Sequence, residues 1–66
     1  MMTIFYMKSN GKIKVCLTGE HYFSIFGEEE EDYELIYNRI VFPQDDFVIR
    51  NLLDYRVLSG VLVLTK

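Results

Sequence analysis

The sequence predicts one small α+β domain: an antiparallel β-meander of four to five strands with one short helix before the last strand. Three observations predict this class. A hairpin signal at Asn10-Gly11 separates two apolar runs, a helix signal follows Pro43, and a run rich in Val and Leu comes last. The same order of elements would also suit a small, partly open barrel. We expect a single domain over residues 1–66, because the chain is too short for two cores.

The first predicted element is a hairpin. Asn-Gly between apolar runs is typical of a type I′ turn, whose two central residues take positive φ. With Asn10 and Gly11 in those positions, Tyr6 faces Val15 and Phe5 faces Cys16. Paired residues share one side of a sheet, so this register predicts a core face made of Ile4, Tyr6, Ile13, Val15 and Leu17.

A third strand is predicted over residues 22–26. The sequence Thr18-Gly19-Glu20-His21 suits a type II′ turn with Gly at its first central position, which would pair Cys16 with Phe23. The second face of the sheet is then also apolar, and it needs a covering helix, barrel closure or a second subunit. Its members are the predicted self-association residues: Phe5, Met7, Cys16, Phe23 and Ile25.

Residues 28–42 allow two interpretations. Apolar residues at 33, 36, 37 and 40 have helical spacing, and the acidic residues before them would lie at the favourable end of that helix. The β-branched and aromatic residues toward Phe42 instead favour a strand from Tyr33 to Phe42. We prefer the strand, because the acidic run makes a natural solvated loop before it.

The last third of the chain predicts a helix and a strand. Asp45 or Asp46 is expected to cap a helix that runs to about Tyr55. A final strand is expected over residues 57–65, where Gly60 suggests a bulge or a bend. The apolar residues on both faces of this strand are typical of a central strand.

Composition excludes several classes of protein. The single Cys16 cannot form an intramolecular disulfide, and one Cys with one His cannot complete a four-ligand zinc site. The chain has 7 basic and 10 acidic residues, and its formal charge of −3 disfavours nonspecific binding of nucleic acid. No targeting segment and no apolar span of ~20 residues is visible. We therefore expect a cytoplasmic protein with no cofactor, no direct contact with nucleic acid and no membrane attachment.

No residue pattern in the sequence is typical of catalysis. His21 has only Glu20 beside it, so we expect a structural turn residue rather than a general base. Cys16 lies among apolar residues, where a thiol behaves as a small inert hydrophobe. The four glycines stand apart, so no phosphate-binding loop is predicted. The chain is not expected to be an enzyme.

The most marked feature is an acidic run that holds six of the ten acidic residues: Glu28, Glu29, Glu30, Glu31, Asp32 and Glu34. Three interpretations compete: a solvated loop or helix start, a divalent-cation site, and a binding surface for a basic protein. The alternating ligands and central Gly of an EF-hand loop are absent, which disfavours the cation site. As a binding surface, the carboxylates would imitate the phosphates of a nucleic acid.

These patterns lead to three functional hypotheses. The preferred one is a non-enzymatic, self-associating protein-interaction module, because the predicted sheet is apolar on both faces. The alternative is an acidic inhibitor or regulator that uses residues 28–34 to engage a nucleic-acid-binding protein. A small enzyme or metal-dependent subunit is least favoured, because a preorganised site needs a supporting layer of polar side chains that this chain can hardly supply.

Overall fold

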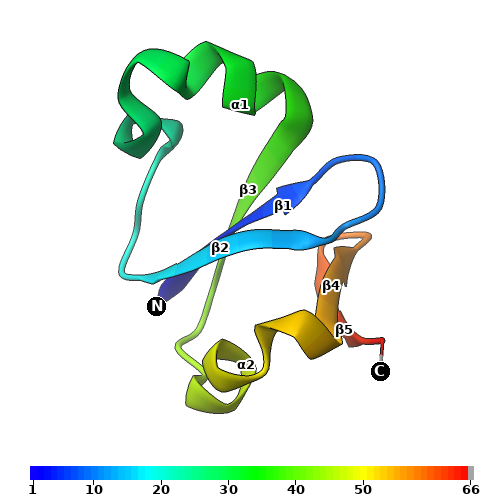
Figure 1. Cartoon of the computed structure of the whole chain (residues 1–66). Helices are drawn as coiled ribbons and strands as arrows, with labels where there is room; N and C mark the ends of the chain where they lie inside the picture. Colours follow the sequence, from blue (N-terminus) through cyan, green and yellow to red (C-terminus); the bar gives the residue numbers. More distant parts are fainter. Residues whose placement is uncertain (66) are drawn as a thin grey trace.

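The computed structural model describes residues 1–65 and contains two antiparallel sheets with helical segments between their strands (Figure 1). The α+β class and the helix before the last strands are confirmed. The two sheets do not close into a barrel within the described residues. In chain order the elements are β1 (Met2–Met7), β2 (Ile13–Thr18), the 3₁₀ helix η1 (Phe23–Glu29), α1 (Glu30–Ile36), β3 (Tyr37–Phe42), α2 (Asp46–Arg50), the 3₁₀ helix η2 (Leu52–Asp54), β4 (Tyr55–Leu58) and β5 (Val61–Leu64).

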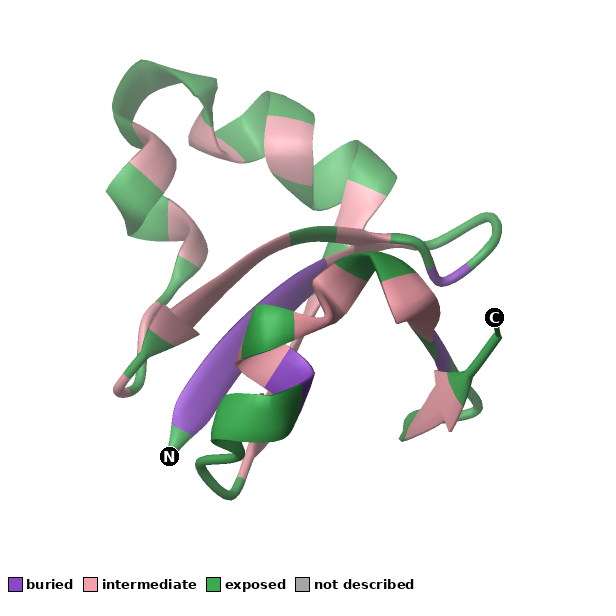
Figure 2. Cartoon of the chain, turned by 60° about the horizontal axis from the view of Figure 1, so that its bottom comes forward, coloured by how far each residue is buried: buried purple, intermediate pink, exposed green. Residues whose placement is uncertain are grey.

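Strand β1 is the centre of the molecule. It pairs with β2 on one edge and with β3 on the other, so the larger sheet has the order β2-β1-β3. Its residues Met2, Thr3, Ile4 and Phe5 have no exposed surface, and Figure 2 shows this strand as the longest buried stretch. A strand whose side chains are buried on both faces requires a cover on each face, and the chain provides both.

The predicted register of the first hairpin is wrong. Ile4 pairs with Cys16 and Tyr6 with Ile13, and the register shifts between Phe5 and Tyr6. The connection is longer than a two-residue turn, because the Met7 N–H donates to the Lys12 carbonyl (2.8 Å). Asn10 does not take the positive φ that a type I′ turn requires; its side chain accepts a bond from the Lys12 N–H (2.8 Å) instead.

The corrected register changes which residues share a face. Val15 and Leu17 lie on the face of Phe5, because they pair with Phe5 and Thr3. Cys16 lies on the opposite face, in the core that Met2 and Ile4 form with Val48 of α2 and Val57 of β4. The predicted grouping of Phe5 with Cys16 is therefore wrong.

The predicted third strand at residues 22–26 is also wrong, since this segment forms the start of η1. The helical turn brings Phe23 and Phe26, which are three residues apart, onto Phe5. Both rings stand edge-on to Phe5 with centroids 5.1 Å away. Tyr33 and Tyr37 continue the aromatic cluster from Phe26, with centroid separations of 4.3 and 5.5 Å.

Each interpretation of residues 33–42 is right for one part of the segment. Glu30–Ile36 is helical, and Tyr37–Phe42 is the strand that pairs with β1. The chain changes from helix to strand at Tyr37 (φ −111°, ψ 154°) without a loop. The preferred strand from Tyr33 therefore began four residues too early. None of the helices within residues 1–65 is long and apolar enough to cross a membrane.

The C-terminal part combines a confirmed cap with a wrong strand. Asp45 caps α2 as predicted, because its carboxylate accepts bonds from the N–H groups of Phe47 (3.0 Å) and Val48 (3.3 Å). The helix ends at Arg50, well before Tyr55. The predicted central strand over residues 57–65 is instead the hairpin of β4 and β5.

The turn of this second hairpin explains the error. Ser59 and Gly60 both have positive φ (53° and 78°), and Leu58 pairs with Val61 across them. This is the backbone of a two-residue type I′ turn, which reverses the chain where a bulge was expected. The hairpin joins the rest of the fold through β4, whose Val57 N–H donates to the Gly11 carbonyl (2.9 Å).

Gly11 should be essential to this junction. It has a φ of +76°, and a Cβ atom added there would lie 2.1 Å from the Val57 carbonyl oxygen. Gly11→Ala is therefore expected to lower the free energy of unfolding by about 3 kcal/mol, measured by urea denaturation. Gly60→Ala is the matched control, because Gly60 has a similar φ of +78° and open space around it. It should cost only about 1 kcal/mol, and equal losses would contradict the close approach.

Candidate functional site

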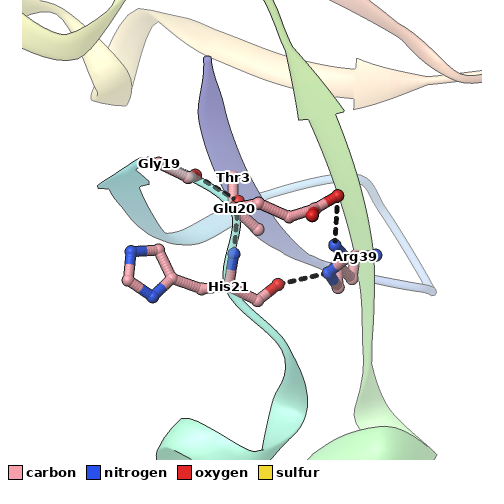
Figure 3. Close-up of polar contacts among 5 residues, drawn as sticks. All are labelled: Thr3, Gly19, Glu20, His21 and Arg39. Carbon is pink, nitrogen blue, oxygen red and sulfur yellow. Dashed lines mark hydrogen bonds and ion pairs between the residues drawn. The ribbon is translucent and has the colours of Figure 1, made fainter.

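The densest group of polar contacts lies where the chain passes from β2 to η1 (Figure 3). Thr3 of β1 has no exposed surface, and its hydroxyl donates to the Gly19 carbonyl (2.6 Å). The same oxygen accepts a bond from the His21 N–H (2.9 Å). One buried hydroxyl therefore serves both a donor and an acceptor of a segment that has left the sheet, and it fixes the start of η1 over β1.

Arg39 of β3 holds the same segment from the other side. Its Nε atom donates to the His21 carbonyl, and its guanidinium lies 4.2 Å from the centre of the Tyr22 ring. Its Nη2 atom is 3.6 Å from a carboxylate oxygen of Glu20. This nitrogen is buried and makes no hydrogen bond within residues 1–65, so Glu20 acts on it as a counter-charge only. Arg39 is thus engaged in holding the connection together.

His21 lies half-buried in this connection, where a structural turn residue was predicted. Its Nε2 atom is 2.8 Å from the Thr18 carbonyl oxygen, which can only accept, so Nε2 carries a proton. The backbone N–H and carbonyl of His21 are bonded to Thr3 and Arg39. The ring, the backbone N–H and the carbonyl of His21 are therefore all bonded within the fold, which is the structural role predicted for this residue.

Cys16 is a half-buried free thiol on the core face of β2. Partial burial raises the pKa of the thiol, because desolvation disfavours the thiolate. The thiol therefore stays protonated to a higher pH than an exposed cysteine. This setting agrees with the expectation of a thiol that packs rather than reacts.

The five predicted self-association residues do not form one surface. Phe5 is fully buried beneath η1, and Phe23 is one of the rings that cover it. Cys16 lies on the other face of the sheet, and Met7 is half-buried at the end of β1. Of the five, only Ile25 is exposed, with 45% of its surface accessible. Of the three covers expected for the second face, a helix, barrel closure or a second subunit, the chain provides the helix, because η1 lies over Phe5.

The acidic run is the end of η1 and the beginning of α1. Five of its six members are exposed and Glu30 is half-buried. Glu30, Glu31 and Asp32 form the first turn of α1, where negative charge is favourable. Of the two forms in the first interpretation, a solvated loop or a helix start, the segment takes the helix start, and the loop preferred before a strand from Tyr33 is wrong. Within residues 1–65 no group of His, Cys, Asp and Glu side chains is arranged to hold a metal ion.

One surface was missed in the sequence. Leu53 of η2 is 93% exposed, and Leu58, Val61 and Leu64 of the β4–β5 hairpin are 42%, 54% and 61% exposed. We call these four residues the C-terminal apolar surface. Within the hairpin, Leu64 lies on the face of Val57 and Leu62, whereas Leu58 and Val61 lie on the other face. The sequence signal for this surface was the uncharged run Val61–Leu64. The same run is also typical of a buried central strand, so the sequence alone did not indicate that it is exposed. The Ser59-Gly60 turn, had it been recognised, would have placed this run at an edge.

The Thr3 hydroxyl should contribute to the free energy of unfolding through both of its hydrogen bonds. Thr3→Val keeps the shape but leaves the His21 N–H and the Gly19 carbonyl without a partner, so unfolding should be easier by about 2–3 kcal/mol. Thr3→Ser keeps the hydroxyl and loses one methyl group, for a cost of about 1 kcal/mol. Urea denaturation of both variants measures the difference. A valine variant as stable as the serine variant would contradict the bridging role.

Comparisons of the chain with protein-family models, with curated proteins and with solved structures found no match. What the chain does is therefore inferred from the placement of its own side chains. Two features stand out among the described residues: the acidic run at the start of α1, and the C-terminal apolar surface. The polar contacts of Thr3, His21 and Arg39 are accounted for by the fold.

Proposed function

We propose that this chain is a small, self-associating protein-interaction module that acts by binding and not by catalysis. The observation that carries the proposal is the C-terminal apolar surface, in which exposed Leu and Val side chains gather on η2 and the β4–β5 hairpin. Exposed apolar side chains that gather in one part of a molecule are costly in water and commonly mark an interface. The hypothesis of self-association is kept, while the surface assigned to it moves from the larger sheet to this hairpin.

The use of the polar side chains supports a binding role. The side chains with the best-defined polar contacts, those of Thr3, His21 and Arg39, bond to the backbone of the β2–η1 connection. A catalytic group needs a free donor or acceptor directed at a substrate. These contacts therefore favour a structural task for the residues that would be the first candidates for chemistry.

Charge distinguishes the C-terminal apolar surface from the exposed apolar side chains at the end of α1. Leu35 and Ile36 of α1 are 77% and 49% exposed, but they follow directly on the acidic run. Two copies meeting there would bring their carboxylates together, which is unfavourable. Strand β5 carries no charged residue, so a second copy can approach it without this cost.

Self-association is tested by sedimentation velocity from about 1 μM to about 1 mM, the range in which weak interfaces dissociate. We expect a reversible shift from monomer to dimer. Leu64→Lys should weaken the dimer at least about tenfold, since burying a leucine contributes about 2 kcal/mol. Leu35→Lys is the matched control and should leave the dimer intact. The proposal would be contradicted by a parent chain that stays monomeric at every concentration, or by Leu64→Lys and Leu35→Lys weakening the dimer equally.

A second candidate function uses the acidic run. Five of its six side chains are exposed, and no ion pair within residues 1–65 joins any of the six to a cation. Their charge is therefore available to a basic partner. Under this alternative the chain is an inhibitor or regulator that occupies the nucleic-acid site of such a protein.

Removing the charges tests this alternative. A variant with Glu28→Gln, Glu29→Gln and Glu31→Gln keeps the size of three exposed side chains and removes three negative charges. If the acidic run binds a nucleic-acid-binding protein, affinity capture from the native host should recover that protein with the parent chain and lose it with the triple variant. Leu64→Lys serves as control and should retain it. Equal recovery by the parent and the triple variant would remove the idea.

A further inference from the structure

The hydrogen-bonding pattern of the C-terminal hairpin shows which backbone groups face outward. In an antiparallel pair, opposite residues alternate between bonding each other and pointing their N–H and C=O groups away. Across the type I′ turn Leu58 and Val61 bond each other, so Leu62 is the next residue of β5 to point away. The bond from the Thr65 N–H to the Asp54 carbonyl (2.7 Å) fits this alternation and makes Leu64 the second.

The two edges of the hairpin differ in how their outward groups are used. On the β4 edge, the Val57 N–H donates to the Gly11 carbonyl, and Lys12 forms a bridge with Arg56. On the β5 edge, the outward groups belong to Leu62 and Leu64, and β4 is the only strand paired with β5 within residues 1–65. The β5 edge also lacks the charges and prolines that usually prevent edge-to-edge pairing.

We propose that two copies of this chain join through β5, paired antiparallel edge to edge about a two-fold axis. This inference rests on the proposed self-association and specifies its geometry. Because Leu62 and Leu64 carry the outward groups, Leu62 of one copy bonds Leu64 of the second copy, and the reverse pair forms by symmetry. Val63 then lies on the axis, opposite its own equivalent. The result is one continuous sheet in the order β4-β5-β5-β4.

Side-chain chemistry favours a second copy as the partner of this edge. Paired residues share a face, so the register places the side chains of Leu62 and Leu64 from both copies together. That face continues the core side of the hairpin, where Val57 pairs with Leu62. Leu64, which is 61% exposed in one chain, becomes covered by an identical side chain. The three central pairs across the axis join Leu or Val residues, and the next pair on either side joins Val61 to Thr65.

Long-range charge also permits this arrangement. Figure 1 and Figure 2 both show α1, whose first turn belongs to the acidic run, at the top of the molecule and the β4–β5 hairpin at the lower right, with the β1–β2 connection between them. The longest dimension of the chain is 32 Å, whereas charges are screened beyond about 8 Å at physiological ionic strength. Two chains joined through β5 therefore keep their acidic runs apart. Pairing with an extended segment of another protein is the competing occupant, and the following experiment separates the two.

Disulfide cross-linking tests the register. In a Cys16→Ala background, Val63→Cys places two thiols on the axis, with Cα atoms about 4.5 Å apart, a distance suited to a disulfide. Val61→Cys is the matched control on the same side of the strand. Four residue steps separate Val61 from its equivalent, which is about 13 Å. Under mild oxidation we expect the Val63→Cys dimer to form at least about tenfold faster than the Val61→Cys dimer, although Val61 is the more exposed residue.

Backbone pairing is tested separately at Leu64. Leu64→Pro removes the outward N–H, which bonds to no described residue, whereas Leu64→Thr keeps it and loses a similar amount of apolar surface. Sedimentation should show a dimer at least about tenfold weaker for the proline variant than for the threonine variant. Denaturation by urea confirms that both variants are folded.

Each outcome decides a specific point. A parent chain that dimerises while Val61→Cys and Val63→Cys cross-link at equal rates overturns pairing through β5 and leaves self-association standing. Equal dimer strength of the proline and threonine variants also overturns it. A parent chain that is monomeric at every concentration, and whose β5 edge binds only a foreign segment, overturns both the edge pairing of two copies and the proposed self-association.

Discussion

The structure depends on the burial of β1 on both faces. Four consecutive residues of this strand have no exposed surface, so two separate covers are required from a chain of 66 residues. Phe23 and Phe26 of η1 cover Phe5 on one face, and Tyr33 of α1 packs behind Phe26. On the other face, α2 and the C-terminal hairpin cover Met2 and Ile4. Each cover is a single layer of short helices or a hairpin. Because a chain this small has no further layer to place over these elements, their outer apolar side chains stay exposed.

The polar contacts are explained by the same requirement. A helical cover can lie over β1 only if the chain leaves the sheet after β2 and turns back, and this exposes backbone groups of residues 19–21 to an apolar interior. Thr3 and Arg39 supply partners for Gly19 and His21 at this position. On the other face, Gly11 allows β4 to approach the first hairpin closely enough for a backbone bond. These residues link the two covers to the sheet.

The sequence predicted elements whose signals are local and failed where distant contacts decide. The α+β class, the first hairpin and the Asp45 cap follow from nearby residues. The register could not be predicted from nearby residues, and Gly11, which the turn signal placed in a two-residue turn, instead bonds to β4, more than forty residues away in the sequence. The segment from Phe23 to Phe26 suits a strand by composition, and only the position of Phe5 makes the helical turn better. The acidic run was identified by charge alone, whereas the C-terminal apolar surface depended on recognising the Ser59-Gly60 turn.

The two candidate functions need not compete, because the features that support them are separated in space. In the proposed dimer the two β5 edges pair with each other at the two-fold axis, and the acidic run of each copy lies on the other side of the β1–β2 connection from β5. A basic partner with two sites at the matching separation would then be bound through both acidic runs. Linking two weak sites raises the apparent affinity by the effective concentration of the second site, without any new contact. A single chain offers the six carboxylates of its acidic run to a partner. Edge pairing through β5 would double that number without using any residue of the acidic run.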